Sequence, residues 1–297
     1  MTQQEFVSIA NTPCYVDISN EVYHESAGIS SSGLKLLAQS PAHYWARYLD
    51  PAREARKRTP ALVLGDQIHT AVLEPARYFQ TYYPLPEKFN RATKQGKADA
   101  EYHEAQAADK GQVVITKDNH EICQRLTETV RDNPAADFLF NADGLIEQSF
   151  YWTESVVLPD TGEIVEVLCK CRPDKLLTGL NIILDLKSAE DASLSAFQRA
   201  SFSYGYHISA AFYLRGVEAV LGIRPTAFVI AAFEKESPFA CSFFQFDNDA
   251  LTQGNADVVR LLQRYAECLA ADEWPGYPHC IRQISLPNWA VTTQATS

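Results

Sequence analysis

Two aspartates lie close together in the middle of the chain, in the segment VLCKCRPDKLLTGLNIILDLKS (Val167–Ser188). This segment predicts two strands joined by a turn, with Gly179 supplying the turn residue. If Gly179 and Leu180 form the centre of a symmetric hairpin loop, counting outward along both strands places Asp174 opposite Asp185. The spacing therefore brings two carboxylates together on neighbouring strands.

Two carboxylates about 5 Å apart repel each other unless something positive lies between them. A divalent cation meets this need, and oxygen ligands favour Mg²⁺ or Mn²⁺ over Zn²⁺. Lys187 shares a face with Asp185 and can stabilise developing negative charge, while the same count places Arg172 opposite Lys187. A solvent-facing hairpin with scattered charges is the alternative, although the apolar run 182–184 favours a buried strand that ends in a site.

The order Pro173-Asp174, ten intervening residues, then Asp185-Leu186-Lys187 resembles the PD-(D/E)XK nuclease signature. The phrases CRPDKL and ILDLKSAED resemble, more narrowly, the RecE (exonuclease VIII) type nuclease domain. The resemblance covers most of the chain, with residues 84–118 as the main exception. It implies an α+β fold with a PD-(D/E)XK (restriction-endonuclease-like) core, in which helices flank a central mixed β-sheet.

The resemblance also implies a set of metal ligands. His69 follows the phrase Leu-Gly-Asp that opens the matching helix, so Asp174, Asp185, the Leu186 backbone carbonyl and His69 would hold one or two Mg²⁺ ions, with Mn²⁺ as a substitute. Lys187 would assist as the third catalytic residue. Asp66 could orient the imidazole. A histidine alone on a helix is otherwise a packing or surface residue.

Further residues have weaker assignments. Glu147 is a candidate for an additional site carboxylate, and an exposed strand glutamate is equally compatible with the pattern. The superfamily often has Gln, three residues and Tyr on a helix after the motif; Tyr213 fits, but Ser209 replaces the glutamine, and its hydroxyl has a shorter reach. Candidate DNA contacts are Arg172, Ser188, Tyr206, Ser209, Tyr213, and Arg56, Lys57 and Arg58 of the basic run 53–58, for which a solvated surface is the alternative.

Hydrophobic periodicity and turn residues predict the order of elements. Helices are expected after residue 31, with Ser31 or Ser32 as cap, after Pro41, around His69, and over 97–109, 117–133 and 248–270. Strands are expected over 144–153, 164–177, 181–187, 226–234 and 239–246, and two helical pieces broken near Gly205 separate the third strand from the fourth. Residues 1–297 are expected to form one domain with an N-terminal helical extension of about 60 residues.

Composition limits the function classes. The net charge of −11 argues against a protein that coats nucleic acid indiscriminately, but it permits a nuclease with a local basic track. No apolar run approaches the ~20 residues of a membrane span, and the first residues lack a signal-peptide pattern, so a cytoplasmic protein without membrane association is expected. Seven cysteines without paired spacing predict reduced thiols and neither a zinc site nor an iron–sulfur cluster.

The resemblance implies a Mg²⁺-dependent exodeoxyribonuclease. Such an enzyme would digest linear double-stranded DNA from 5′ ends and leave 3′ single-stranded tails for recombination by strand annealing. It would form a ring-shaped homo-oligomer, with a tetramer favoured, and would work with a single-strand annealing protein of the RecT type, as in prophages. The alternatives are a nuclease of other polarity or substrate (single-stranded DNA or a repair endonuclease), a catalytically silent DNA-binding module, and an acid-pair glycosidase, which Lys187 and His69 fit poorly.

Overall fold

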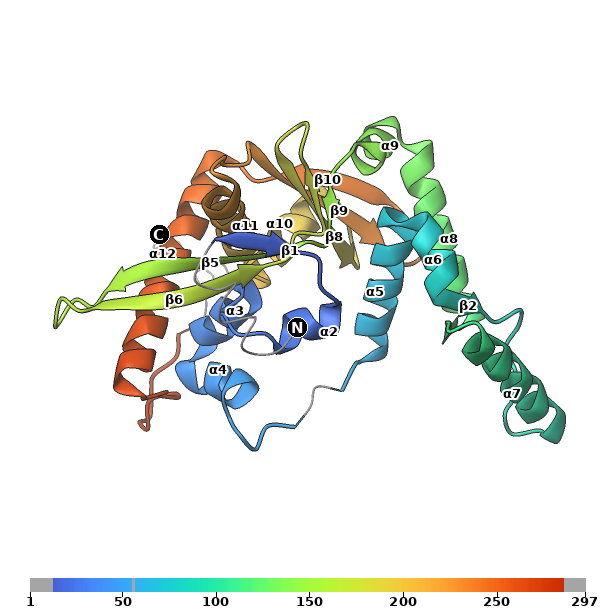
Figure 1. The fold of residues 1–297 in the computed structure, drawn as a ribbon, viewed down its shortest axis with the longest axis horizontal. Coiled ribbons are helices and arrows are strands. Elements are labelled where there is room, and N and C mark those ends of the chain that lie inside the picture. Colours follow the sequence, from blue (N-terminus) through green and yellow to red (C-terminus); the bar gives the residue numbers. More distant parts are fainter. Residues whose placement is uncertain (1–12, 55–56, 286–297) are drawn as a thin grey trace, which may run out of the picture.

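A five-stranded mixed sheet forms the centre of the molecule (Figure 1). The computed structural model describes residues 13–54 and 57–285. The sheet has the order β10-β9-β8-β7-β4, in which β8 and β9 are parallel and the other pairs are antiparallel. Its strands are β4 (Leu145–Ile146), β7 (Lys175–Leu177), β8 (Ile182–Ala189), β9 (Ala227–Glu234) and β10 (Cys241–Gln245). The predicted α+β fold with a central mixed sheet is confirmed.

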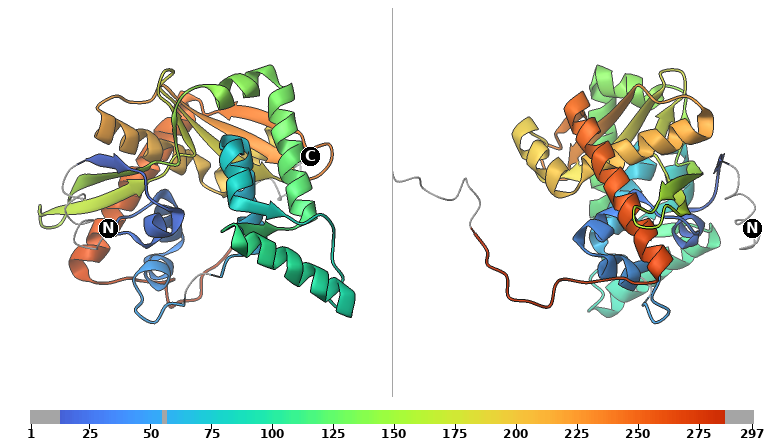
Figure 2. Two further views of the ribbon diagram at one scale, coloured as in Figure 1. Left: turned by 45° about the vertical axis from the view of Figure 1, so that its right-hand side comes forward. Right: turned by 90° about the vertical axis from the view of Figure 1, so that its left-hand side faces the viewer.

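Helices cover both faces of this sheet because its central strands are apolar on both sides. On β8, Ile183 packs into one core with α11 (Tyr206–Leu221), whereas Leu184 and Leu186 pack into another with α5 (Pro60–Leu73) and α8 (Lys117–Asp132). The parallel strands β8 and β9 need a crossover, and two helices supply it. One face carries α10 (Leu194–Ser203), α11 and α12 (Asn248–Ala271), and the other carries α5, α8 and α9 (Pro134–Asn141) (Figure 2).

A second sheet adjoins the first and corrects the prediction of continuous strands. The predicted strands 144–153 and 164–177 each bend and contribute to both sheets. Glu147 has φ 46° between β4 and β5, and Pro173, which lacks an N–H for a ladder, lies between β6 and β7. The Glu147 amide donates to the Asp174 carbonyl (3.0 Å), which joins the bends. The second sheet has the order β1-β5-β6, with β1 (Cys14–Val16), β5 (Ser149–Val157) and β6 (Ile164–Cys171).

Two of the early helices, α3 (Ser31–Gln39) and α4 (Pro41–Tyr48), belong to the same core as α11 and α12. Helix α2 (Asn20–Glu25) precedes α3 and α4, whose Leu34, Leu37 and Tyr44 are buried in that core. Ser30, rather than the predicted Ser31 or Ser32, caps α3, and its hydroxyl accepts the Gly33 amide (3.2 Å). The Tyr44 ring stacks on Trp274, as expected for an aromatic that packs in the core.

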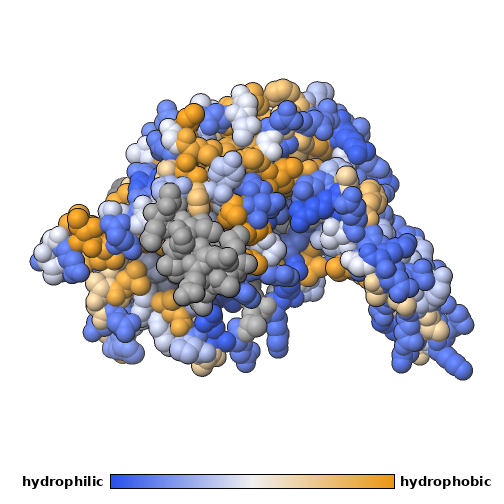
Figure 3. All heavy atoms as spheres, viewed as in Figure 1, coloured by the Kyte–Doolittle hydropathy of each residue, from blue (hydrophilic) through white to orange (hydrophobic). Residues whose placement is uncertain are grey.

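Residues 82–115 project from the body as an arm (Figure 1). After α6 (Pro75–Thr81), the short strands β2 (Tyr82–Pro84) and β3 (Val113–Ile115) pair in parallel, and α7 (Lys94–Asp109) extends beyond them. The arm is largely hydrophilic on the face that Figure 3 shows. The arm contains most of residues 84–118, the segment that the family resemblance did not cover.

None of the helices in residues 13–54 and 57–285 combines the length and the hydrophobicity needed to cross a bilayer. All seven cysteines are free thiols, and four of them are buried.

Candidate active site

The β7–β8 hairpin has the register that the sequence predicts. Lys175 pairs with Leu184 and Leu177 with Ile182, so Asp174 lies one step beyond the ladder, opposite Asp185. The turn differs in one detail, because Asn181 and not Gly179 has a left-handed backbone (φ 54°). The Asn181 side-chain amide donates to the Arg224 carbonyl (2.8 Å), which ties the turn to the chain entering β9.

The two carboxylates lie on facing strands, with Asp185 buried and Asp174 largely buried. The side chain of Asp174 is 14% exposed and that of Asp185 is 6% exposed. The Leu186 amide donates to Asp174 Oδ2 (2.6 Å), which fixes the orientation of the carboxylate. Burial, and also the negative charge of Asp185, raise the pKa of Asp174 above its ordinary value, against the opposing effects of His69 and Lys187. The protein therefore concentrates negative charge here at an energetic cost.

Lys187 is an electrostatic partner of both acids. Its ammonium forms an ion pair with Asp185 and donates to the Leu186 carbonyl (3.1 Å). Burial alone would lower the pKa of Lys187, but the charges of Asp185 and Asp174 raise it above its usual value. The two acids therefore favour the charged ammonium form, which can stabilise negative charge.

His69 approaches the acids from α5, on the side of the sheet that holds Leu184 and Leu186. Its Nδ1 atom lies 3.5 Å from Asp174 Oδ1. Thr59 caps this helix, and Ile68, Ala71 and Val72 fix its rotation by packing in the core. The predicted orienting residue, Asp66, instead forms an ion pair with Arg58, which precedes the helix.

The two carboxylates and the imidazole are ligands that suit a hard cation, although the three side chains are not placed to hold one ion together. Within the described residues, no group of three or more His, Cys, Asp or Glu side chains is placed to hold a metal ion. Asp185 lies against Lys187, and Asp174 against His69 and the Leu186 amide. Two buried carboxylates on facing strands, one with a raised pKa, nevertheless provide the oxygen chemistry that a divalent cation favours.

Comparison with known proteins identifies the family. The family described as "PDDEXK-like domain of unknown function (DUF3799)" matches residues 30–283. The chain belongs to this family. No match is found among the curated proteins.

Two solved structures give the structural context of this PDDEXK-like domain. The crystal structure of a candidate exonuclease from Eubacterium rectale superposes with a TM-score of 0.54, at 15% sequence identity, over 92% of this chain and 96% of the other. A phage-related exonuclease from Haemophilus somnus 129PT gives a TM-score of 0.32, at 12% identity, over 83% of this chain and 96% of the other, and at that score it carries no argument. The first match supports the fold, and family membership supports a nuclease. PDDEXK nucleases generally use divalent metals.

Several predicted DNA contacts of the PDDEXK-like domain lie beside the acids. Helix α11 brings Tyr206 to the site, where the Lys187 ammonium lies 5.7 Å from the centre of its ring. Burial, and then the charge of Asp185, raise the pKa of Tyr213, so its phenol stays protonated. Ser209, on the same helix, accepts a hydrogen bond from Lys35 of α3 (3.1 Å). Sequence reasoning missed Lys35, because no local pattern links α3 to this helix.

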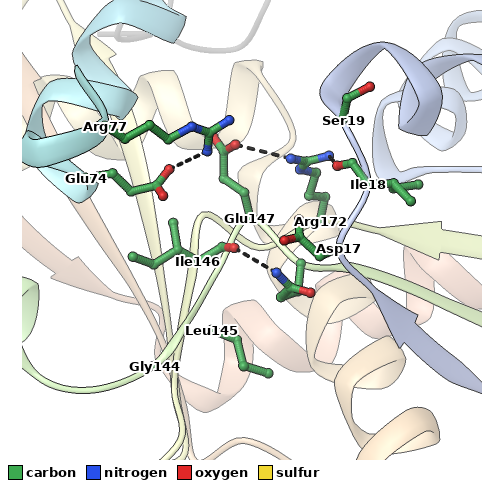
Figure 4. A pocket seen from close by; sticks show the side chains of 11 residues that line it. Asp17, Ile18, Ser19, Glu74, Arg77, Gly144, Leu145, Ile146, Glu147 and Arg172 are labelled. Carbon is green, nitrogen blue, oxygen red and sulfur yellow. Dashed lines mark hydrogen bonds and ion pairs between the residues drawn. The ribbon is translucent and has the colours of Figure 1, made fainter. Parts of the chain in front are cut away.

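Glu147 and Arg172 lie together in a neighbouring groove. Their side chains form an ion pair (3.2 Å), and Arg172 also donates to the Ile18 carbonyl (2.9 Å). The groove has a volume of 530 Å³, and Figure 4 shows Arg77 and Arg172 approaching Glu147 from opposite sides. Glu147 and Arg172 are therefore engaged with each other, and the roles predicted for them stay predictions.

Lys57 and Arg58 of the basic run precede α5. Arg56 falls outside the described residues, Lys57 is exposed, and Arg58 pairs with Asp66. Ser188 is exposed near the end of β8. Their contacts with DNA also stay predictions.

Proposed function

We propose that this protein is a Mg²⁺-dependent exodeoxyribonuclease that digests linear double-stranded DNA from 5′ ends and leaves 3′ single-stranded tails. The observation that carries the proposal is the buried pair Asp174 and Asp185, with Lys187 on the same strand and His69 at the edge of the pair. The order of these residues resembles the PD-(D/E)XK signature, and the family to which the chain belongs is described as PDDEXK-like.

Each residue has a part in phosphodiester hydrolysis. Asp174, Asp185, the Leu186 carbonyl and His69 would hold the cation. A divalent cation would lower the pKa of the attacking water and neutralise charge on the phosphate. Lys187, held protonated by the two acids, stabilises the negative charge that grows on the phosphate oxygens. The Leu186 amide keeps Asp174 pointed toward the site.

The direction of digestion and the assembly are part of the proposal. Resemblance to RecE-type domains favours action from 5′ ends, a homotetrameric ring around the DNA, and cooperation with a single-strand annealing protein of the RecT type in the cytoplasm. A ring is compatible with the net charge of −11, because only its interior would have to attract DNA. Light scattering during gel filtration measures the number of subunits: four would support the ring, and a monomer at micromolar concentration would contradict it.

The experiment compares four DNA substrates in Mg²⁺. Linear duplexes labelled at the 5′ or the 3′ end, a nicked circle and a closed circle are incubated with the protein, with EDTA as control. The proposal predicts early release of the 5′ label, retention of the 3′ label in the single-stranded product, resistance of the closed circle and no reaction in EDTA. Cleavage of the closed circle would instead indicate an endonuclease, and hydrolysis that continues in EDTA would refute metal dependence.

A further inference from the structure

A second lysine lies beside the acid pair. Lys35, from α3, donates to Ser209 on α11 (3.1 Å), and its ammonium lies 5.8 Å from the centre of the Tyr206 ring. Lys187 approaches the same ring at 5.7 Å. Two cations from elements far apart in the sequence thus gather around one aromatic side chain.

The local backbone accommodates this lysine. Gly205 begins α11 with φ +62°, and a Cβ atom there would lie 3.0 Å from Lys35 Cδ, so a larger residue would press on the lysine stem. The N-cap Gly205 has no side chain to cap the first amides of α11, and the helix therefore adds partial positive charge near its beginning.

This concentration of positive charge is only partly balanced. Lys187 has Asp185 as its ion-pair partner, whereas no carboxylate in residues 13–54 or 57–285 forms an ion pair with Lys35. Burial, and then the charge of Lys187, lower the pKa of Lys35 to about 8, although the negative charge of Asp185 acts in the opposite direction. Lys35 has three donors, and its bond to Ser209 leaves two for another acceptor. An anion at this position would relieve the repulsion, as a cation would between the two aspartates.

We propose that Lys35 binds a non-bridging oxygen of the DNA phosphate that the enzyme hydrolyses, with Ser209 and Gly205 positioning its side chain. This inference rests on the proposed nuclease function.

Charge balance supports the assignment. The two aspartates and the two lysines cancel, so a divalent cation gives the site two positive charges. A phosphodiester carries one negative charge and gains a second when hydroxide attacks. The completed site therefore matches the charge of the transition state rather than that of the substrate.

The first test measures hydrolysis by Lys35→Met and Lys35→Arg at saturating Mg²⁺. The variant Lys94→Met is the matched control, because it removes one positive charge from the exposed surface of the arm. We expect kcat/KM to fall about 100-fold in Lys35→Met, to recover in part in Lys35→Arg and to stay within about twofold in the control. The Mg²⁺ concentration for half-maximal rate and the thermal midpoint should change little.

The second test uses inorganic phosphate and needs no catalysis. At constant ionic strength and without metal, phosphate should raise the thermal midpoint of the wild-type protein, and this rise should disappear in Lys35→Met and persist in Lys94→Met. If the wild-type protein hydrolyses no DNA while this difference remains, the nuclease proposal fails and the anion site stands. Lys35→Met with wild-type hydrolysis, or with an unchanged response to phosphate, would overturn the role of Lys35.

Discussion

The two sides of the site are built in different ways. The acidic side, Asp174 and Asp185, comes from one hairpin whose register fixes which residues face each other. The basic side joins Lys35 on α3 to Ser209 on α11, 174 positions apart in the chain, and depends on the packing of both helices in the larger core. The difference suggests that the cation site is set by local strand pairing and the phosphate site by tertiary packing.

The largest effect is expected from the acidic side. Replacing Asp185 by Asn removes a cation ligand and the ion-pair partner of Lys187, so we expect at least a thousandfold loss of Mg²⁺-dependent DNA hydrolysis. Circular dichroism should still show a folded protein. Asp191→Asn, at an exposed position shortly after β8, is the control and should retain activity. Full activity in Asp185→Asn would refute the assignment of the site.

Replacing Lys187, which lies between the acidic and the basic side of the site, should have the next largest effect on hydrolysis. Lys187→Met leaves Asp185 without its ion-pair partner and removes a positive charge that acts on Asp174, and we expect kcat to fall about 100-fold or more. Lys187→Arg keeps the charge and should recover part of this loss. Single-turnover rates with saturating DNA give the comparison, and equal rates for the Met and Arg variants would show that charge is not the contribution of this residue.

The free energy of unfolding should depend on pH because Asp174 is buried close to a second carboxylate. The pKa of Asp174 is raised in the folded protein, so the folded state binds more protons than the unfolded state between the ordinary carboxyl pKa and the raised value. Ionisation of Asp174 therefore lowers the free energy of unfolding as pH rises through that window. Without metal at pH 8, Asp174→Asn should melt a few degrees above the wild-type protein, and the gap should narrow as pH approaches 4.

Mg²⁺ provides the control for this prediction. It should raise the thermal midpoint of the wild-type protein at pH 8 and leave that of Asp174→Asn nearly unchanged, since the variant lacks one ligand carboxylate. An Asp174→Asn protein that melts below the wild-type protein at pH 8 would show that the buried carboxylate is stabilising as it stands.

The smallest effect is expected from Ser209. Ser209→Ala removes the hydroxyl that holds the Lys35 ammonium, so we expect a loss of only a few-fold in kcat/KM. The loss should be absent in a protein that already carries Lys35→Met, because the two side chains act through one contact. Additive losses in the double variant would indicate independent roles.

The parts of the fold that depend on local signals could be predicted. The strand pairing that faces Asp174 with Asp185 follows from an apolar run, a turn and the alternation of a strand. The bends at Glu147 and Pro173, which divide two predicted strands between two sheets, could not be predicted as readily, because a left-handed glutamate leaves no sequence pattern. Lys35 was missed for a related reason: its role depends on Ser209, which only the packed helices bring near.

The most direct test of the account is a calorimetric titration of the metal-free protein with Mn²⁺. The wild-type protein should bind Mn²⁺, Asp174→Asn and Asp185→Asn should each lose most of that binding, and Lys35→Met should keep it. Mn²⁺ binding of wild-type affinity in both aspartate variants would contradict the claim that the buried carboxylate pair is the cation site.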